Sequence, residues 1–424
     1  HITDEIKNAI KNLDLHDHYD VIIVEVGGTV GDIESLPFLE AIRQLRLELG
    51  RNNAINIHLT LVPYIRVADE IKTKPTQHSV GKLREIGIQP DIILCRTEKP
   101  LTQKIKAKIA LFCNVAEDCV IQAIDVDEIY RIPLIFKQEK LDEIIIALLA
   151  LKCKKSDLRD WQEKVVTPAV SPKYKTRIAV IGKYIELQDA YKSIYESLRH
   201  GGIANNSKVE IKKVDAAHIE NLGAESVLAD VDGILVPGGF GVRGIEGKIA
   251  AIKYARERRI PYFGICLGMQ TAVIEFARNV VGMKKANSTE FNKNTPYPVI
   301  SLLEEQKKVK NLGGTMRLGL YPCKLKKGTF AFKAYKRTEL CERHRHRYEF
   351  NNKYQSRLEK LGIRFSGICG KGNLVEIVEL KNHPWFVGCQ FHPEFRSKPD
   401  RCHPLFREFI KAALKRKAKD KNSD

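Results

Sequence analysis

The feature that most constrains how this chain folds is the stretch Gly264-Ile265-Cys266-Leu267-Gly268. An apolar run at 260–263 precedes it and a helical pattern at 269–278 follows it, which predicts a buried strand, a tight turn and a helix. The two glycines permit the turn, because a side chain there would collide with the neighbouring strand or helix. The N–H groups and dipole of the helix N-terminus face the Cys266 sulfur and favour the thiolate. The stretch therefore predicts an α/β sheet with a nucleophilic Cys266 at the end of one strand.

Two further motifs supply what a cysteine nucleophile needs. His392 and Glu394 lie two residues apart in one short loop, where the histidine can take the thiol proton and the glutamate can orient the imidazole. Gly238 and Gly239 follow a strand-like run at 233–236, and their backbone N–H groups, with that of Leu267, can bind an oxyanion. Taken alone, a cysteine in an apolar run is usually a small buried hydrophobe. The combination predicts an acyl-transfer site with Cys266, His392 and Glu394 as catalytic residues.

Two regions of alternating strands and helices predict two doubly wound parallel-sheet domains, which is an α/β fold class. Expected strands lie at 19–25, 55–62, 91–95 and 118–121 in the first region, and at 177–181, 208–214, 231–236 and 260–265 in the second. Expected helices lie at 35–49, 101–112, 141–151, 190–200, 244–258 and 405–414. Short runs at 316–321, 374–380 and 385–391 predict antiparallel additions that bring His392 back to Cys266. The expected domains are 1–151, a charged linker without regular structure at 152–176, a second domain at 177–416 and a charged tail at 417–424.

Composition limits the class of protein. The chain has 43% apolar and 29% charged residues, typical of a globular protein, and no apolar run approaches the ~18 residues that span a bilayer. Its ten cysteines form no CxxC pair, which indicates thiols in a reducing compartment rather than disulfides or zinc. With no signal peptide at its start, we expect a cytoplasmic protein with no membrane partner.

The motifs around the cysteine resemble those of class I glutamine amidotransferases, which hydrolyse glutamine. The longer stretches 237–248 and 262–270 resemble the C-terminal half of the CTP synthase family, and this resemblance extends over essentially the whole chain. An amino-acid ligand has an ammonium group and a carboxylate, so its site needs one protein partner of each charge sign. Without the resemblance, Glu290 and Arg347 would be interpreted as surface charges. The resemblance implies a glutamine site made by Gly238, Gly239, Leu267, Gly268, Met269, Gln270, Glu290 and Arg347.

For the N-terminal domain the resemblance implies a P-loop-type amidoligase that aminates UTP to CTP, with ATP and Mg²⁺ and without an organic prosthetic group. Glu25 matches the metal-binding glutamate, Asp32, Ile33 and Glu34 match a segment that contacts product CTP, and Ile124, Asp125 and Val126 match the adenine pocket. A UTP/CTP site shared between subunits of a homotetramer matches Lys72, Thr73, Lys74, Pro75, Thr76, Gln77 and Lys108. CTP is the expected feedback ligand and GTP the expected activator, beside a lid at 313–319 that includes Arg317. Taken alone, a loop with two lysines would be interpreted as solvated.

The chain departs from the family pattern at its start. The family has a P-loop-like glycine turn with its lysine, and a second metal carboxylate, before the first strand of this region. Residues 26–31 are glycine-rich, but no Gly-Lys-Ser/Thr follows them, so they do not replace that turn. We therefore expect an amidoligase domain that is incomplete at its N-terminus, and a polypeptide competent at most for the glutaminase half of the reaction.

Two other functions fit parts of the sequence. A different glutamine amidotransferase, such as a GMP synthase-like enzyme, would share the cysteine turn and the His-x-Glu loop, but not the stretches 25–34 and 72–77. A basic nucleic-acid-binding or assembly protein would use the net charge of +19 and would show a steep salt dependence of binding. The positive residues are spread along the chain, except at 343–347 and 411–421, and several bound nucleotides would call for the same charge balance. We therefore expect glutamine, UTP, ATP, CTP and GTP as ligands, and no nucleic acid.

Overall fold

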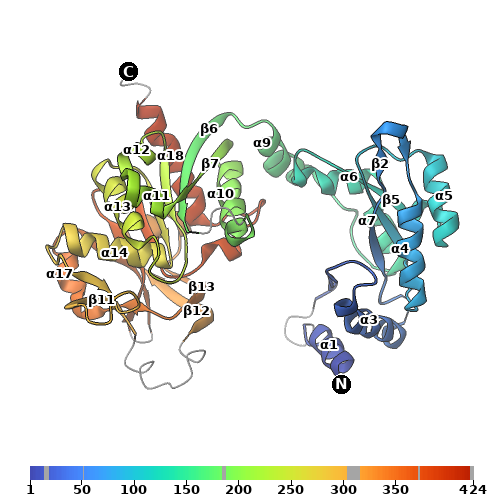
Figure 1. Cartoon of the computed structure of the whole chain (residues 1–424), viewed down its shortest axis with the longest axis horizontal. Coiled ribbons are helices and arrows are strands. Elements are labelled where there is room, and N and C mark those ends of the chain that lie inside the picture. The colour runs from blue at the N-terminus through green and yellow to red at the C-terminus, as the bar shows by residue number, and fades with distance from the viewer. Residues whose placement is uncertain (14–18, 51, 184–187, 303–315, 371–372, 421–424) are drawn as a thin grey trace. The chain divides into compact units, whose positions relative to one another are not determined.

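The computed structural model of the chain describes residues 1–13, 19–50, 52–183, 188–302, 316–370 and 373–420. It divides into two compact units, His1–Gln162 and Glu163–Asp424, called unit 1 and unit 2 below (Figure 1). None of the described helices is long and apolar enough to cross a membrane. All ten cysteines are free thiols, as the sequence predicts.

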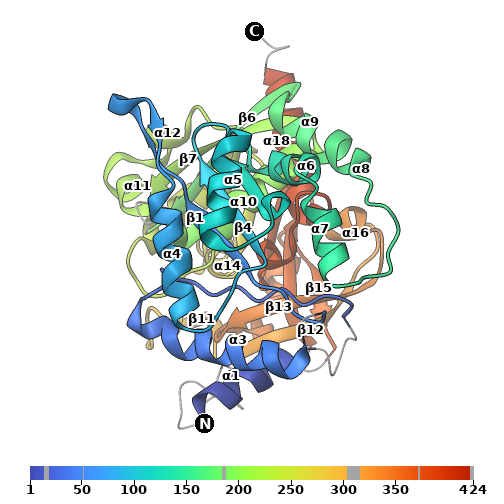
Figure 2. The same cartoon turned by 90° about the vertical axis from the view of Figure 1, so that its right-hand side faces the viewer.

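Unit 1 is built on a parallel three-stranded sheet in the order β1-β4-β5. Adjacent residues of β4 point to opposite faces: Ile93 packs with Val80 and Ile109 from α4 and α5, whereas Ile92 packs with Leu141 from α7. Figure 2 shows α4 and α5 together on one side of the strands. Its elements are α1 (Ile2–Lys11), α3 (Leu36–Leu49), β1 (Ile57–Leu61), the short pair β2 (Tyr64–Ile65) and β3 (Glu70–Ile71), α4 (Lys74–Glu85), β4 (Ile92–Thr97), α5 (Gln103–Cys113), β5 (Val120–Ile124), α6 (Ile132–Gln138), α7 (Leu141–Leu148) and α8 (Arg159–Trp161).

The strand expected at 19–25 is absent from the structure, so this prediction is wrong. The segment has no regular secondary structure, and Ile23 is 90% exposed. An apolar run becomes a parallel strand only where a neighbouring strand supplies hydrogen bonds and helices cover its faces. Among the described residues, no strand pairs with this segment.

Unit 2 contains a nine-stranded sheet in the order β13-β12-β15-β16-β17-β9-β8-β6-β7. The strands from β17 to β7 are parallel, and those from β13 to β17 are antiparallel. Ile234 and Leu235 of β8 face opposite layers, the first with α13 and α14 and the second with α10 and α18. Unit 2 is therefore doubly wound as expected, and the antiparallel strands lie at one side as the short runs predict.

The bounds in unit 2 follow the sequence expectations within a few residues. The elements are α9 (Thr167–Val170), β6 (Tyr174–Gly182), α10 (Lys192–Ala204), β7 (Ser207–Asp215), α11 (Ala216–Leu222), α12 (Ala224–Leu228), β8 (Gly233–Val236), α13 (Ile245–Glu257), β9 (Tyr262–Ile265), α14 (Leu267–Asn279), β10 (Ala286–Ser288), β11 (Tyr297–Ser301), β12 (Arg317–Leu325), α16 (Phe330–Tyr335), β13 (Glu339–His346), β14 (Glu349–Phe350), α17 (Gln355–Glu359), β15 (Ile363–Cys369), β16 (Leu374–Leu380), β17 (Phe386–Cys389) and α18 (Pro404–Asp420). A small separate sheet has the order β10-β11-β14.

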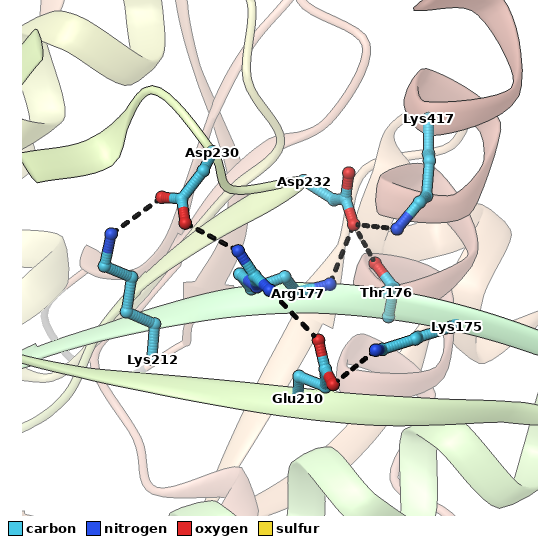
Figure 3. Close-up of polar contacts among 8 residues, drawn as sticks. All are labelled: Lys175, Thr176, Arg177, Glu210, Lys212, Asp230, Asp232 and Lys417. Atoms are coloured by element: carbon cyan, nitrogen blue, oxygen red, sulfur yellow. Dashed lines mark hydrogen bonds and ion pairs between the residues drawn. The ribbon is translucent and has the colours of Figure 1, made fainter. Parts of the chain in front are cut away.

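Two boundary regions contain more regular structure than the predicted elements, which are a charged linker at 152–176 and a helix at 405–414. Within 152–176 the chain forms α8, a π-helical turn at Gln162–Val166, and α9, because Val165 and Val166 are buried and fix the backbone there. At the other end, α18 continues to Asp420, beyond the predicted boundary at 416. Figure 3 shows why this end is ordered: Lys417 reaches Asp232, which also binds Thr176 and the backbone of Arg177 in β6.

Candidate active site

The turn at the end of β9 places Cys266 where β9 meets α14. Its backbone adopts φ 51° and ψ −100°, a conformation rarely found outside glycine and typical of strained functional turns. Glycine is required at 268, because a Cβ there would lie 2.1 Å from the carbonyl oxygen of Val236. The Cys266 N–H donates to Cys389 O at 2.7 Å, so the turn is attached to β17 as well as to β8. The sequence prediction of strand, turn and helix is confirmed.

β17 carries the histidine loop to this turn. β17 pairs in parallel with β9, with Gly388 opposite Gly264, so both strands end at the same edge of the sheet. Three residues after β17, His392 is 8% exposed, and its Nδ1 lies 2.7 Å from Oε1 of Glu394. Burial alone would lower the pKa of His392, but the Cys266 sulfur and the Glu394 carboxylate raise it to about 10. The neighbouring sulfur and carboxylate therefore favour positive charge on this imidazole, which suits a group that accepts a proton from the cysteine.

The glycine loop after β8 lies against the side chains of both Cys266 and His392. A Cβ on Gly238 would stand 2.9 Å from Cε1 of His392 and 3.6 Å from Cβ of Cys266. The absence of a side chain thus lets the loop approach the cysteine and the histidine at once. The three motifs that the sequence places far apart meet at this point.

The residues predicted to hold glutamine surround the same place. Oε1 of Glu290 accepts a hydrogen bond from the N–H of Gly241 at 3.0 Å. Nε2 of Gln270 donates to the carbonyl oxygen of Tyr348 at 2.9 Å, which places the segment with Arg347 beside α14. Burial and the nearby Glu290 carboxylate raise the pKa of Tyr348. The structure therefore brings Glu290, Gln270 and the 347–348 segment to one side of Cys266.

Sequence reasoning missed Gln390, whose side chain contacts the Cys266 sulfur directly. This residue is fully buried, and its Nε2 lies 3.6 Å from Sγ of Cys266. A signal was available: in extended backbone, residues two apart point to the same side, so Gln390 should share the orientation of His392.

Arg317 lies in a buried cluster of charges beside the site. Its guanidinium donates to Glu349 at 2.8 Å and to Glu376 at 2.9 Å. Burial, only partly offset by Arg317, raises the pKa of Glu376 to about 8. His346 also contacts Glu349, with 2.7 Å between Nε2 and Oε1. Of the predicted lid at 313–319, residues 313–315 lie outside the described residues, whereas Leu318 and Gly319 follow Arg317 in β12.

In unit 1 several predicted nucleotide residues gather at the carboxyl edge of the sheet. The N–H of Lys72 donates to Pro63 O beyond the end of β1. At the end of β5, Asp125 bonds through its N–H to Thr97 O and pairs with Arg96 at 3.0 Å. Ligands of parallel α/β sheets bind at this edge. Ile124 closes β5 and Val126 follows Asp125, so all three residues predicted for the adenine pocket lie here.

The N-terminus of α4 presents residues of the predicted UTP/CTP site. Pro75 lies in the first turn of α4, Thr76 is buried against Thr60, and Nε2 of Gln77 donates to Oγ1 of Thr73 at 3.1 Å. Nζ of Lys74 lies 5.9 Å from the ring centre of Phe112 in α5. Because Lys108 is one helical turn before Phe112, both lysines face the same neighbourhood, which suits a polyphosphate.

The predicted metal residue, Glu25, is exposed in the segment without regular structure. Asp32 accepts a hydrogen bond from the N–H of Thr29 at 2.7 Å and begins the turn that contains Ile33 and Glu34. Among the residues that the structure describes, no group of three or more His, Cys, Asp or Glu side chains is arranged to hold a metal ion. A nucleotide-bound Mg²⁺ takes only one or two protein carboxylates, so the single carboxylate of Glu25 is compatible with that ion.

Comparison with known proteins decides the family. Residues 1–151 match the family model for the CTP synthase N-terminus, and residues 186–412 match the model for class-I glutamine amidotransferases. The CTP synthase of Syntrophus aciditrophicus is 59% identical over 419 residues, which cover 99% of this chain and 77% of that protein. The chain belongs to the CTP synthase family.

A second relative and a solved structure agree with this CTP synthase assignment. The CTP synthase of Carboxydothermus hydrogenoformans is 58% identical over 415 residues, covering 98% of this chain and 77% of that protein. The glutaminase domain of Trypanosoma brucei CTPS, solved with bound acivicin, is 41% identical with a TM-score of 0.54, covering 57% of this chain and 94% of that one. The chain is accordingly an ATP-dependent, glutamine-hydrolysing CTP synthase. The N-terminal match favours this assignment over a GMP synthase-like enzyme.

Proposed function

We propose that unit 2 of this CTP synthase hydrolyses glutamine with Cys266, His392 and Glu394 as its catalytic residues. The observation that carries the proposal is the position of Gly238, where an added Cβ would stand only 2.9 Å from Cε1 of His392 and 3.6 Å from Cβ of Cys266. This arrangement puts nucleophile, acid/base and N–H donors around one point, as acyl transfer requires. The short contact between His392 and Glu394 fixes the orientation of the imidazole.

The chemistry follows from these positions. His392 takes the thiol proton, and the Cys266 thiolate attacks the side-chain amide carbon of glutamine. The N–H groups of Gly238, Gly239 and Leu267 stabilise the resulting oxyanion. When the C–N bond breaks, the imidazolium gives its proton to the leaving ammonia. His392 then activates a water molecule, which cleaves the thioester and releases glutamate.

The substrate is held by residues of opposite charge. Glu290 faces the ammonium group of glutamine and Arg347 its carboxylate, while the backbone of Leu267, Gly268 and Met269 and the side chain of Gln270 border the amide. The bond from Gly241 to Glu290 supports this role, because it fixes the carboxylate beside the loop that binds the oxyanion. The hydrolysis of glutamine supplies the ammonia that UTP amination consumes.

For unit 1 we propose the nucleotide functions. The triphosphate of UTP or CTP binds Lys72, Lys74 and Lys108 near the N-terminus of α4, and ATP binds beside the 124–126 segment. Glu25 contributes a carboxylate to Mg²⁺, which offsets charge on the phosphates when it is bound. Asp32 to Glu34 contact CTP. GTP acts as activator through the region that includes Arg317, and the working protein is a cytoplasmic homotetramer.

Glutamate release from glutamine tests the proposal for unit 2. We expect Cys266→Ala to abolish release and Cys341→Ala, which changes an exposed cysteine of the same unit, to preserve it. Addition of GTP should raise the rate in the wild type and in Cys341→Ala. Glutamate release by a folded Cys266→Ala protein at the wild-type rate would contradict the assignment.

Binding measurements test the proposal for unit 1. Lys74→Ala should weaken UTP and CTP binding about tenfold, since it removes one charge-assisted phosphate contact. Lys82 lies on the same helix in an exposed pair with Glu85, so Lys82→Ala serves as the matched control and should bind both nucleotides normally. Equal affinities in the two variants would exclude Lys74 from the site.

A further inference from the structure

A chain of three side-chain hydrogen bonds ends on the nucleophile. Nε2 of Gln270 donates both to Tyr348 O at 2.9 Å and to Oε1 of Gln390 at 3.2 Å. Nε2 of Gln390 then donates to Sγ of Cys266 at 3.6 Å. Gln270 is 3% exposed and Gln390 is fully buried, so bulk water does not compete for these donors.

The order of donors in this chain is dictated from one end. A backbone carbonyl such as Tyr348 O can only accept, so the amide of Gln270 must direct its NH₂ group toward it. The second hydrogen of that NH₂ group is directed at Gln390, so the side-chain oxygen of Gln390 must accept it. The NH₂ group of Gln390 is thereby turned toward Cys266. The opposite assignment would place two oxygens face to face at Tyr348, or two NH₂ groups face to face between the glutamines.

The backbone around Gln390 is also fixed. Its N–H donates to Glu376 O at 2.8 Å, which continues the pairing of β16 with the end of β17. The neighbouring Cys389 accepts the N–H of Cys266 at 2.7 Å. The position of the Gln390 amide relative to the sulfur is therefore determined by the sheet as well as by Gln270.

We propose that Gln390 is a further catalytic residue of the glutaminase reaction, which stabilises and orients the Cys266 thiolate through a side-chain N–H that Gln270 and Tyr348 hold in place. A donor bonded to sulfur favours the anion over the thiol, because the thiol has its own hydrogen to place. Cys266 is 5% exposed and lies in a largely apolar cluster, where a thiolate without donors would be costly. Gln390 supplies such a donor to the sulfur.

The same bond affects the trajectory of attack. Without the Gln390 donor, the sulfur could rotate about the Cα–Cβ bond of Cys266. The Gln390 N–H restricts the sulfur to the side from which this donor approaches. Correct alignment of this kind contributes to turnover rather than to substrate affinity.

This inference rests on the proposed role of Cys266, and its test does not depend on activity. The rate at which iodoacetamide alkylates Cys266 is measured against pH and read by mass spectrometry of the Cys266 peptide. The exposed Cys341 of the same protein is the internal control. If Cys266→Ala still hydrolysed glutamine, the proposed function would fail, whereas the alkylation profile would still report whether Gln390 stabilises the thiolate.

Gln390→Met keeps the length of the side chain and removes the donor. We expect its Cys266 alkylation midpoint to move up by about one pH unit, with an alkylation rate near neutral pH about tenfold lower and an unchanged profile for Cys341. The kcat for glutamine should fall about tenfold with little change in KM. Gln390→Glu, which replaces the donor by an anion, should shift the midpoint further in the same direction. Superposable Cys266 profiles in wild type and a folded Gln390→Met protein would overturn the proposal.

Gln270→Met tests the orientation of the Gln390 amide without changing Gln390 itself. It also tests the proposal if the Gln390 variants do not fold. The freed Gln390 amide can then turn its oxygen to the sulfur for part of the time. We expect an upward shift of the Cys266 midpoint smaller than that of Gln390→Met. A purely structural role for the two glutamines predicts a lower melting temperature in Gln270→Met with the Cys266 profile unmoved, and that result would also overturn the proposal.

Discussion

Nδ1 of His392 lies 2.7 Å from Oε1 of Glu394, two residues further along the same loop. Because a carboxylate only accepts, Nδ1 must carry a hydrogen, and Nε2 is left to exchange the proton of the reaction. The loop itself is fixed by the bond from the N–H of His392 to Arg343 O in β13, at 2.8 Å. One short loop therefore determines the tautomer and the orientation of the His392 imidazole and favours its positive charge.

The first prediction concerns Glu394→Gln. The amide can still occupy the space of the carboxylate, but it no longer attracts positive charge, so the pKa of His392 should fall from its raised value of about 10. By analogy with loss of the orienting carboxylate in serine protease triads, we expect kcat for glutamine hydrolysis to fall about 10²- to 10⁴-fold. KM should change little, since the carboxylate does not contact substrate. Steady-state glutamate release checks this, and a fall of less than about threefold would count against the triad.

The second prediction concerns the turn. Gly268→Ala places a Cβ 2.1 Å from the carbonyl oxygen of Val236, and neither backbone segment can move without breaking the sheet. We expect a loss of about 3 kcal/mol in the free energy of unfolding, together with loss of glutaminase activity. Gly370→Ala is the control, because its Cβ would meet nothing within 4 Å. Denaturant unfolding of both variants gives the comparison, and equal stability would show that the turn has room to adjust.

The predictable part of the site was local. The Cys266 turn lies in a short stretch whose glycines and apolar run are enough to predict a strand, a turn and a helix. The structure has β9 and α14 at the predicted positions. The expected strand at 19–25 failed for a different reason. Its apolar residues satisfy strand propensity, but pairing depends on a neighbour that local sequence does not describe.

The contacts that link distant segments could not be read from the sequence. Arg317 has the appearance of a surface charge, yet Glu349 and Glu376, 32 and 59 residues away, enclose it. In 343–347 the alternation of β13 buries His344 and His346 and exposes Arg343 and Arg345, so part of a basic run lies in the interior. These outcomes depend on which strands become neighbours, which local periodicity does not determine.

The third prediction concerns Lys248 on α13, which is 1% exposed. Burial, reinforced by the nearby Lys183 and opposed by Asp215 and Glu290, lowers its pKa from 10.5 to about 8. Between these values the unfolded chain binds more protons than the folded protein, so stability should rise with pH in that window. Lys248→Met should remove this contribution, and the free-energy gap between variant and wild type should change by about 2 kcal/mol from about pH 7.5 to about pH 9.5.

Lys253→Met is the matched control for that experiment, because Lys253 lies on the same helix and is exposed. Its unfolding free energy should follow the pH dependence of the wild type. Parallel curves for Lys248→Met and the wild type would mean that Lys248 titrates alike in the folded and unfolded states.

The last prediction concerns two neighbouring aspartates that differ in burial (Figure 3). Oδ2 of Asp232 accepts hydrogen bonds from Thr176 Oγ1 at 3.1 Å, Arg177 N at 2.7 Å and Lys417 Nζ at 3.2 Å. Asp232 thereby connects the start of β6 and the end of α18 to the segment that leads into β8. The residue is only 9% exposed. Asp232→Ala leaves buried donors without an acceptor, so we expect a loss of about 2 kcal/mol in unfolding free energy.

Asp230 supplies the contrast. It pairs with Arg177 at 2.6 Å and with Lys212 at 2.7 Å. Its side chain is 46% exposed, so solvent screens both ion pairs. Asp230→Ala should therefore lower the free energy of unfolding by less than about 1 kcal/mol. Lys417→Ala separates the components at Asp232, because it removes the ion pair and keeps the bonds to Thr176 and Arg177; its cost should lie between those of the two aspartate variants. Chemical denaturation monitored by circular dichroism ranks the three. Similar losses for Asp230→Ala and Asp232→Ala would mean that net charge in this region matters more than the buried hydrogen bonds, and that the end of α18 is held mainly by its apolar face.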